Sequence, residues 1–301
     1  MKGTMRDAFW NVIHAEMVED PALFVLTADF GAPGLDRIAA DYADRFLSVG
    51  ISEQNLVNVA AGLAQEGCRV VAYGIAPFFL RAAEQIRINL AMASQFRPLN
   101  VTLVGVGVGF SYVVSGPSHH ALEDLAVLRA FPGVGVITPS DTASAASAAL
   151  LTRRAGIRYL RFDSQVLPEL YPNDFRFPDT GYVLLRDDPR HRVLLIGSGA
   201  MTHAALEVAE ALDAAVLDLL SLRGTPFGAL PDYGVVCTLE EGVADCGGID
   251  SWVRAQLPDT RVVSFGTRGP YEFRARSRHE LRRAFGMDAD SIIAAIREVV
   301  K

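Results

Sequence analysis

The acidic residue best placed for chemistry is Glu53, in the segment Gly50-Ile-Ser-Glu-Gln-Asn55. This segment joins a predicted strand over 46–49 to a predicted helix over 52–65, so the carboxyl group lies in the first turn of the helix. Ligands of open α/β sheets bind at such junctions, outside the carboxyl ends of the strands. A carboxylate in a first turn also complements the helix dipole, so spacing alone leaves a ligand contact and a structural role open.

Two adjacent histidines close the segment Ser115-Gly-Pro-Ser-His-His120. The segment follows a glycine-rich strand end over 105–109 and precedes a predicted helix over 122–130. Histidine is the side chain best suited to proton transfer near neutral pH, so this position favours contact with a ligand. The pair could equally be exposed residues at a helix start. Adjacent histidines cannot easily face one ion, and no third ligand is near in the sequence, so we predict no metal site in this chain.

Two further segments could bind an anion. Arg161 ends a predicted strand over 157–161, and its guanidinium could hold a phosphate or carboxylate, or form a surface ion pair. The segment Gly197-Ser-Gly-Ala-Met-Thr202 resembles a dinucleotide-binding fingerprint but has Thr202 where the third glycine belongs. A helix start there can still bind an anion, but the pattern does not favour a nicotinamide site.

The elements that position these residues alternate between short β-branched runs and longer helical patterns. Among them we predict a helix over 78–94, a strand over 100–104 and an alanine-rich helix that is capped by Ser140 or Asp141 and ends at Leu151. Such alternation predicts an α/β protein whose mainly parallel sheets carry helices on both faces. A segment containing Pro168, Pro172 and Pro178 interrupts the alternation, which then restarts. We therefore predict two domains, at 1–166 and 181–301, joined by a linker over 167–180.

Composition narrows the classes of function. The 301 residues carry a net charge of −7, which disfavours general binding to nucleic acid or to an anionic membrane. The apolar runs fall well short of the roughly 18–20 residues that a membrane helix needs. The three cysteines have spacings that suit no zinc site. We predict a reduced, cytoplasmic setting with no nucleic-acid or membrane partner.

An ordered set of motifs resembles a known family. The segment containing Glu53 is followed by Ala60-Ala-Gly-Leu-Ala64, Ala76-Pro-Phe-Phe-Leu-Arg81, Ser115-Gly-Pro-Ser-His119 and Ile157-Arg-Tyr-Leu-Arg161. This order and spacing resemble the pyrimidine-binding domain of thiamine-diphosphate enzymes, above all transketolase and 1-deoxy-D-xylulose-5-phosphate synthase. Thr238-Leu-Glu-Glu-Gly242 and Gly247-Gly248 resemble the C-terminal domain of the same family.

The resemblance implies a role for each candidate residue. Glu53 matches the glutamate that hydrogen-bonds N1′ of the cofactor's aminopyrimidine, and a carboxyl group removed from water can keep the proton that this bond needs. Phe78 matches the aromatic residue that stacks on the pyrimidine. His119 matches the histidine that faces the reacting carbonyl. The implied cofactor contacts are thus Glu53, Phe78, Asp29 and Arg81, and the implied substrate contacts are Ser115, His119, His120 and, for a phosphate, Arg161.

Departures from the family pattern concern the substrate. Ser115 stands where the family has an aspartate that contacts a donor hydroxyl, and Gly107 stands where transketolase has a further histidine. An altered donor or acceptor is the natural interpretation. The acceptor could be a sugar, an aldehyde or a carrier-bound thioester.

The family's diphosphate domain, with its Gly-Asp-Gly…Asn motif for Mg²⁺, has no counterpart in this sequence. The resemblance therefore implies a subunit that needs a separate, Mg²⁺-holding partner, as an α2β2 heterotetramer, to transfer a two-carbon ketol unit. Two alternatives stay open. The chain could be the β subunit of a 2-oxoacid dehydrogenase-type decarboxylase, or a non-catalytic scaffold that has kept the fold.

Overall fold

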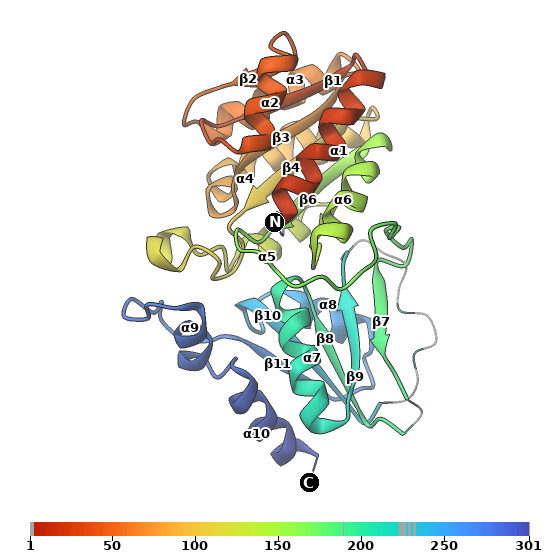
Figure 1. The fold of residues 1–301 in the computed structure, drawn as a ribbon, viewed down its shortest axis with the longest axis vertical. Helices are drawn as coiled ribbons and strands as arrows, with labels where there is room; N and C mark the ends of the chain where they lie inside the picture. The colour runs from red at the N-terminus through yellow and green to blue at the C-terminus, as the bar shows by residue number, and fades with distance from the viewer. Residues whose placement is uncertain (1–2, 189, 223–226, 228–229, 231–232, 301) are drawn as a thin grey trace.

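The computed structural model describes residues 3–188, 190–222, 227, 230 and 233–300. Two sheets divide the chain, one built before residue 163 and one after residue 181. Figure 1 shows them one above the other, with the N-terminus near their junction and the C-terminus at the far end of the second. The predicted linker over 167–180 falls in the stretch between the sheets, and the domain limits at 1–166 and 181–301 stay our prediction, with residues 1, 2 and 301 outside the described part.

The first sheet has six parallel strands among the described residues, in the order β2-β1-β3-β4-β6-β5. Neighbouring strands end together at the carboxyl edge, where Gly105 of β4 pairs with Arg161 of β6. The strands are β1 Leu23–Thr27, β2 Phe46–Ser48, β3 Arg69–Ile75, β4 Asn100–Val106, β5 Val134–Ile137 and β6 Gly156–Phe162. The prediction of a helix-covered parallel sheet is confirmed.

Helices cover both faces of this sheet because its strands are apolar on both sides. Val71 of β3 packs with Phe9 and Trp10, whereas Val70 packs with Leu56 on the opposite face. The first face carries α1 Met5–Glu19, α2 Pro33–Asp41 and α6 Thr142–Leu150, followed by η6 Leu151–Arg153. The second face carries α3 Glu53–Gln65 and α5 Asp124–Arg129.

The segment after β3 differs from the single helix predicted over 78–94. It begins as a 3₁₀-helix with Pro77 in its first turn, passes through one short α-turn and a π-helix, and ends as a second 3₁₀ turn. These pieces are η1 Ala76–Ala82, α4 Ala83–Gln85, η2 Ile86–Met92 and η3 Ala93–Gln95. Such departures from the α-helix occur often at functional sites, and η1 carries two of the candidate site residues.

The second sheet has five strands in the described part of the chain, in the order β11-β10-β8-β9-β7. The edge strand β7 runs antiparallel to β9, and the other pairings are parallel. The strands are β7 Tyr182–Arg186, β8 Val193–Gly197, β9 Ala215–Leu219, β10 Val235–Val243 and β11 Val262–Thr267. The helices, which again cover both faces, are α7 Ala200–Leu212, α8 Ile249–Gln256, α9 Arg278–Ala284 and α10 Ala289–Val299.

An ionic cluster ties the two sheets together. Arg278 lies 2.5 Å from the Asp163 carboxylate beyond β6 and 2.7 Å from Glu241 of β10. Glu241 also accepts hydrogen bonds from Arg282 at 2.7 Å and from the backbone N–H of Phe110 at 2.9 Å. Burial alone would raise the pKa of the Glu241 carboxyl, but the charges of Arg278 and Arg282 outweigh it and lower that pKa to about 2.

This shift predicts acid sensitivity with a defined sign. The folded pKa of Glu241 lies below its ordinary value of 4.5, so its stabilising contribution is full above that value and is lost as the pH falls towards 2. Glu241→Gln should therefore lower the melting temperature at neutral pH, and the gap to the wild type should narrow on acidification. A gap that stays constant across this range would contradict the assignment, and Glu66→Gln, at an exposed position, is the control.

Candidate functional site

Glu53 begins α3 and is buried, with only 3% of its surface exposed. Its Oε2 atom is inaccessible and accepts no hydrogen bond from any residue that the structure describes. The nearest charge is Arg81 of η1, whose Nη1 lies 3.6 Å from that oxygen. The Arg81 side chain is 60% exposed, so this ion pair is weak. A buried carboxyl oxygen without a partner is costly, which points to a ligand atom as its missing partner.

An aromatic contact lies on the same turn. Phe78 of η1 meets the ring of His119 edge to face, with centroids 5.3 Å apart. His119 ends the short turn η5 Pro117–His119, and its Nδ1 lies 3.1 Å from the Ser118 hydroxyl. The tight coil of η1 thus places Arg81 toward Glu53 and Phe78 toward His119. Four of the predicted site residues gather around this one turn.

Two other candidates lie apart from these contacts. Asp29 follows β1 at the carboxyl edge of the sheet and is exposed, with a φ of 55°. A non-glycine residue in this left-handed region is uncommon and is found often at functional sites. Ser115 ends η4 Val113–Ser115 and is also exposed. Their predicted roles stay predictions.

His120 turns away from His119. It is only 5% exposed, and its ring packs edge to face on Phe110 at 5.3 Å, toward the second domain. Burial lowers the pKa of His120, which favours a neutral ring. The structure therefore does not bring His120 to the group around η1.

Arg161 has a partner that sequence reasoning missed. Its Nε and Nη2 donate to both carboxylate oxygens of Asp124 at 2.9 and 3.0 Å, and the Tyr159 hydroxyl donates to the same carboxylate at 2.8 Å. The Arg161 side chain is 4% exposed and that of Asp124 is fully buried. Arg161 is thus not in a surface ion pair, and only its third nitrogen, 3.5 Å from the Thr138 hydroxyl, is directed away from Asp124. The sequence contains one signal for this partner, because Asp124 stands at the first position of a helix whose next residues are apolar.

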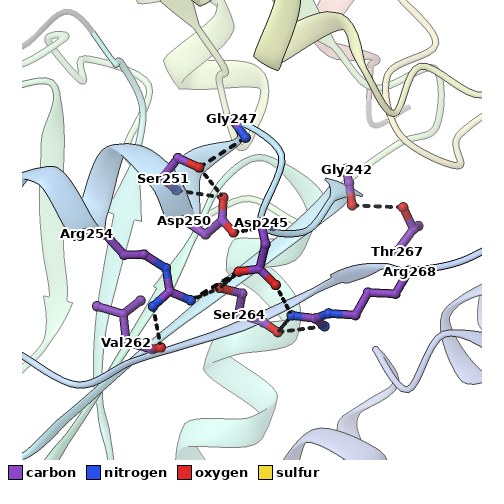
Figure 2. Close-up of polar contacts among 10 residues, drawn as sticks. All are labelled: Gly242, Asp245, Gly247, Asp250, Ser251, Arg254, Val262, Ser264, Thr267 and Arg268. Atoms are coloured by element: carbon purple, nitrogen blue, oxygen red, sulfur yellow. Dashed lines mark hydrogen bonds and ion pairs between the residues drawn. The ribbon is translucent and has the colours of Figure 1, made fainter.

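The second domain holds α5 through a turn after β10. In Figure 2, Asp245 lies between Arg254 and Arg268, and its carboxylate accepts from these guanidinium groups at 3.2 and 2.8 Å. The turn presents the Gly247 carbonyl to Arg129 of α5, at 2.7 Å. Because Asp124 begins this helix, the turn supports the element that holds Arg161.

Glycine is required in this turn because the backbone at Gly248 approaches the Glu240 side chain closely. A Cβ atom on Gly248 would lie 2.3 Å from a carboxylate oxygen of Glu240. Glu240 is buried and accepts the Ile249 N–H at 2.7 Å. Burial raises the pKa of Glu240 to about 7, against the opposing charge of Arg161. The Glu-Glu and Gly-Gly motifs of this domain therefore have packing roles in the structure.

Neither a metal cluster nor a membrane span is found among the described residues. No group of three or more His, Cys, Asp or Glu side chains lies close enough in the described ranges to hold a metal ion. Of the helices in the described part of the chain, none has the length and apolar character needed to cross a membrane.

Comparisons with known proteins identify the family. The family described as transketolase, pyrimidine binding domain, matches residues 1–168. A protein from Actinobacillus succinogenes, named as one of the subunits of apulose-4-phosphate transketolase, is 30% identical over 84% of this chain and 84% of its own length. Mouse transketolase is 32% identical over 86% of this chain, which covers 43% of that enzyme.

Solved structures show the same relationship. One titled "Split gene transketolase, inactive beta4 tetramer" aligns with a TM-score of 0.82 at 28% identity, covering 99% of this chain and 98% of that chain. A transketolase from Leishmania mexicana aligns with a TM-score of 0.78 at 20% identity and shows the shared fold, with this chain covering 45% of it. The chain belongs to the transketolase family, and its first 168 residues are a transketolase pyrimidine-binding domain.

Proposed function

We propose that this chain is the pyrimidine-binding subunit of a split, thiamine-diphosphate-dependent transketolase that transfers a two-carbon ketol unit. The observation that carries the proposal is Glu53, a buried carboxyl group with an unpartnered oxygen beside an aromatic contact. Relatives matched over most of their own length are named as single subunits of a transketolase. This chain covers only 43% of the mouse transketolase that it matches, which is about twice as long.

The residues around η1 fit the aminopyrimidine of the cofactor. Glu53 Oε2 has no hydrogen-bond partner among the described residues, so it can hydrogen-bond a ring nitrogen such as N1′. Phe78 offers a flat apolar face for stacking. Thiamine diphosphate, when bound, supplies the carbon nucleophile.

His119 is the proposed proton-transfer residue toward the substrate. Its ring rests against Phe78 on one side, and the Ser118 hydroxyl contacts Nδ1. That arrangement leaves Nε2 for a substrate oxygen, which imidazole can protonate or deprotonate near neutral pH. Arg81 and Asp29, both exposed, are proposed to contact the cofactor, and Ser115 a donor hydroxyl.

The partner chain is proposed to hold the diphosphate and Mg²⁺. Mg²⁺ in such sites uses carboxylate and diphosphate oxygens in octahedral geometry, and the sequence contains no Gly-Asp-Gly…Asn motif for it. An α2β2 assembly would place each pyrimidine site against a partner chain. The split-gene relative, described as an inactive β4 tetramer, supports a β-type chain that requires a partner.

Reconstitution tests this proposal. The chain alone should show no ketol transfer, and adding a partner with the diphosphate motif should give turnover of a ketose donor that depends on thiamine diphosphate and Mg²⁺. Carbon dioxide release from a 2-oxo acid without ketose turnover would instead support a decarboxylase β subunit. Absence of cofactor binding by the complex would support the scaffold.

A further inference from the structure

A pocket of about 180 Å³ lies where the two domains meet, on the side of His120. We call it the junction pocket. The first domain contributes Phe110, His120, Leu122 and Glu123, and Tyr271, Glu272 and Phe285 are among the residues from the second. Because His120 turns away from His119, the pocket is distinct from the group around η1.

The walls of the junction pocket are held in place by contacts between the domains. Phe110 and Phe285 stack with centroids 5.9 Å apart and planes 9° apart. The backbone N–H of Val243 donates to the Leu122 carbonyl at 3.3 Å. The Tyr271 hydroxyl donates to Glu123 at 2.6 Å. A ligand would therefore enter a largely preformed space, which lowers the entropic cost of binding.

The imidazole and the carboxylates of the pocket are acceptors, and the Thr267 and Tyr271 hydroxyls already donate to Gly242 and Glu123. His120 Nε2 is buried and has no hydrogen-bond partner in the described part of the chain. The ring also bonds to the backbone of Val113, and burial disfavours its charged form, so a neutral His120 can accept a hydrogen bond at Nε2. Glu123 and Glu272 add carboxylates, and of the described lining residues none is Lys or Arg. A ligand that complements this set donates hydrogen bonds and carries positive charge.

Size and aromatic content define the ligand further. An apolar cavity of about 150 Å³ is enough for a benzene-sized ring, so 180 Å³ accommodates one ring with a short substituent. The aromatic residues Phe110, Phe285 and Tyr271 in the lining suit an apolar body, and aromatic rings can also attract a cation. We propose that the junction pocket binds a small organic cation, a primary ammonium group on a ring-sized apolar body, with His120 Nε2 accepting from the ammonium.

Calorimetric titration of the full chain with three probes of one size tests this proposal. Benzylamine carries the cation, benzyl alcohol is neutral and benzoate is anionic. We expect saturable binding of one benzylamine per chain, with benzyl alcohol at least about 10-fold weaker, because tenfold in affinity corresponds to about 1.4 kcal/mol of charge interaction. Failure of benzylamine to saturate at about 10 mM, or binding of benzoate as tight as that of benzylamine, overturns the proposal.

Single substitutions test whether benzylamine binds in the junction pocket. His120→Phe keeps the contact with Phe110 but removes the acceptor, and Glu123→Gln removes one charge. Each variant should weaken the binding of benzylamine about 10-fold or more. The control Glu84→Gln changes an exposed carboxylate far from the pocket in the sequence and should leave the affinity unchanged. Equal benzylamine affinity in all three variants and the wild type would show that the amine binds elsewhere. None of these measurements requires ketol transfer, so the result is independent of the proposed function.

Discussion

In the reconstituted complex, Glu53→Gln should lower kcat by about 10²–10⁴-fold, the range typical of losing a positioned proton-transfer group. Glutamine has the same shape as glutamate, so the packing at the start of α3 should persist. Its amide cannot exchange a proton with a ring nitrogen, so cofactor activation fails while the fold remains. Because the buried Glu53 Oε2 accepts no hydrogen bond from the described residues and its ion pair with the exposed Arg81 is weak, replacing the carboxylate should leave the melting temperature unchanged or raise it.

The matched control is Glu66→Gln at the other end of the same helix, where the side chain is exposed. This variant should keep wild-type turnover and melting temperature. Stopped-flow and steady-state assays at saturating cofactor separate a loss in kcat from a loss in affinity. Wild-type turnover by Glu53→Gln would refute its role. So would a rate loss that follows only from a lower melting temperature.

Much of the fold could be predicted because buried parallel strands are continuous apolar runs. The strand predicted over 100–104 is β4 Asn100–Val106, and the helix predicted from a Ser140 or Asp141 cap is α6 Thr142–Leu150. In that cap, the Asp141 side chain accepts the Ser144 N–H. Local signals of this kind act within a few residues, so sequence alone contains them.

Elements that depend on distant partners were harder to predict. The antiparallel edge strand β7 Tyr182–Arg186 was missed because its direction depends on pairing with β9 rather than on its own pattern. The irregular coil over 76–95 was predicted as one helix, since apolar spacing does not separate 3₁₀, α and π turns. The sequence analysis also did not predict the helix α2 Pro33–Asp41, although a proline at the first position is typical of a helix start.

The candidate site likewise combines residues that the sequence motifs indicate with contacts that only the folded structure reveals. The motif order pointed to Glu53, Phe78, Arg81 and His119, each of which follows a strand of the same sheet. In the structure Arg81 lies near Glu53 and Phe78 contacts His119, and the roles of these residues stay predictions. The sequence also grouped His120 with His119 because the two are adjacent, but the His119 ring contacts Phe78 whereas the His120 ring packs on Phe110. The burial of the ion pair between Asp124 and Arg161 could not be predicted from the sequence either, because it depends on packing between elements far apart in the chain.

The ion pair of Asp124 and Arg161 should therefore show the largest effect on stability. Asp124→Ala leaves the Arg161 guanidinium buried without its carboxylate, and breaking such a pair typically costs about 3–5 kcal/mol. Tyr159 also loses its acceptor. Urea unfolding should show this loss directly. Glu84→Ala, which breaks the exposed pair with Arg87, should leave stability nearly unchanged.

A double-mutant cycle separates the pair from general damage at the position. Arg161→Met with Asp124→Leu replaces both charges by apolar groups of similar size, and such replacements are often neutral or stabilising. The double variant should therefore be more stable than Asp124→Ala, although it removes more native contacts. If the stability losses of the single variants Asp124→Leu and Arg161→Met simply add in the double variant, the carboxylate and the guanidinium do not depend on each other. Turnover of the refolded double variant with a phosphorylated and an unphosphorylated ketose then measures what Arg161 contributes to the substrate, because a lost phosphate contact raises KM for the phosphorylated donor alone.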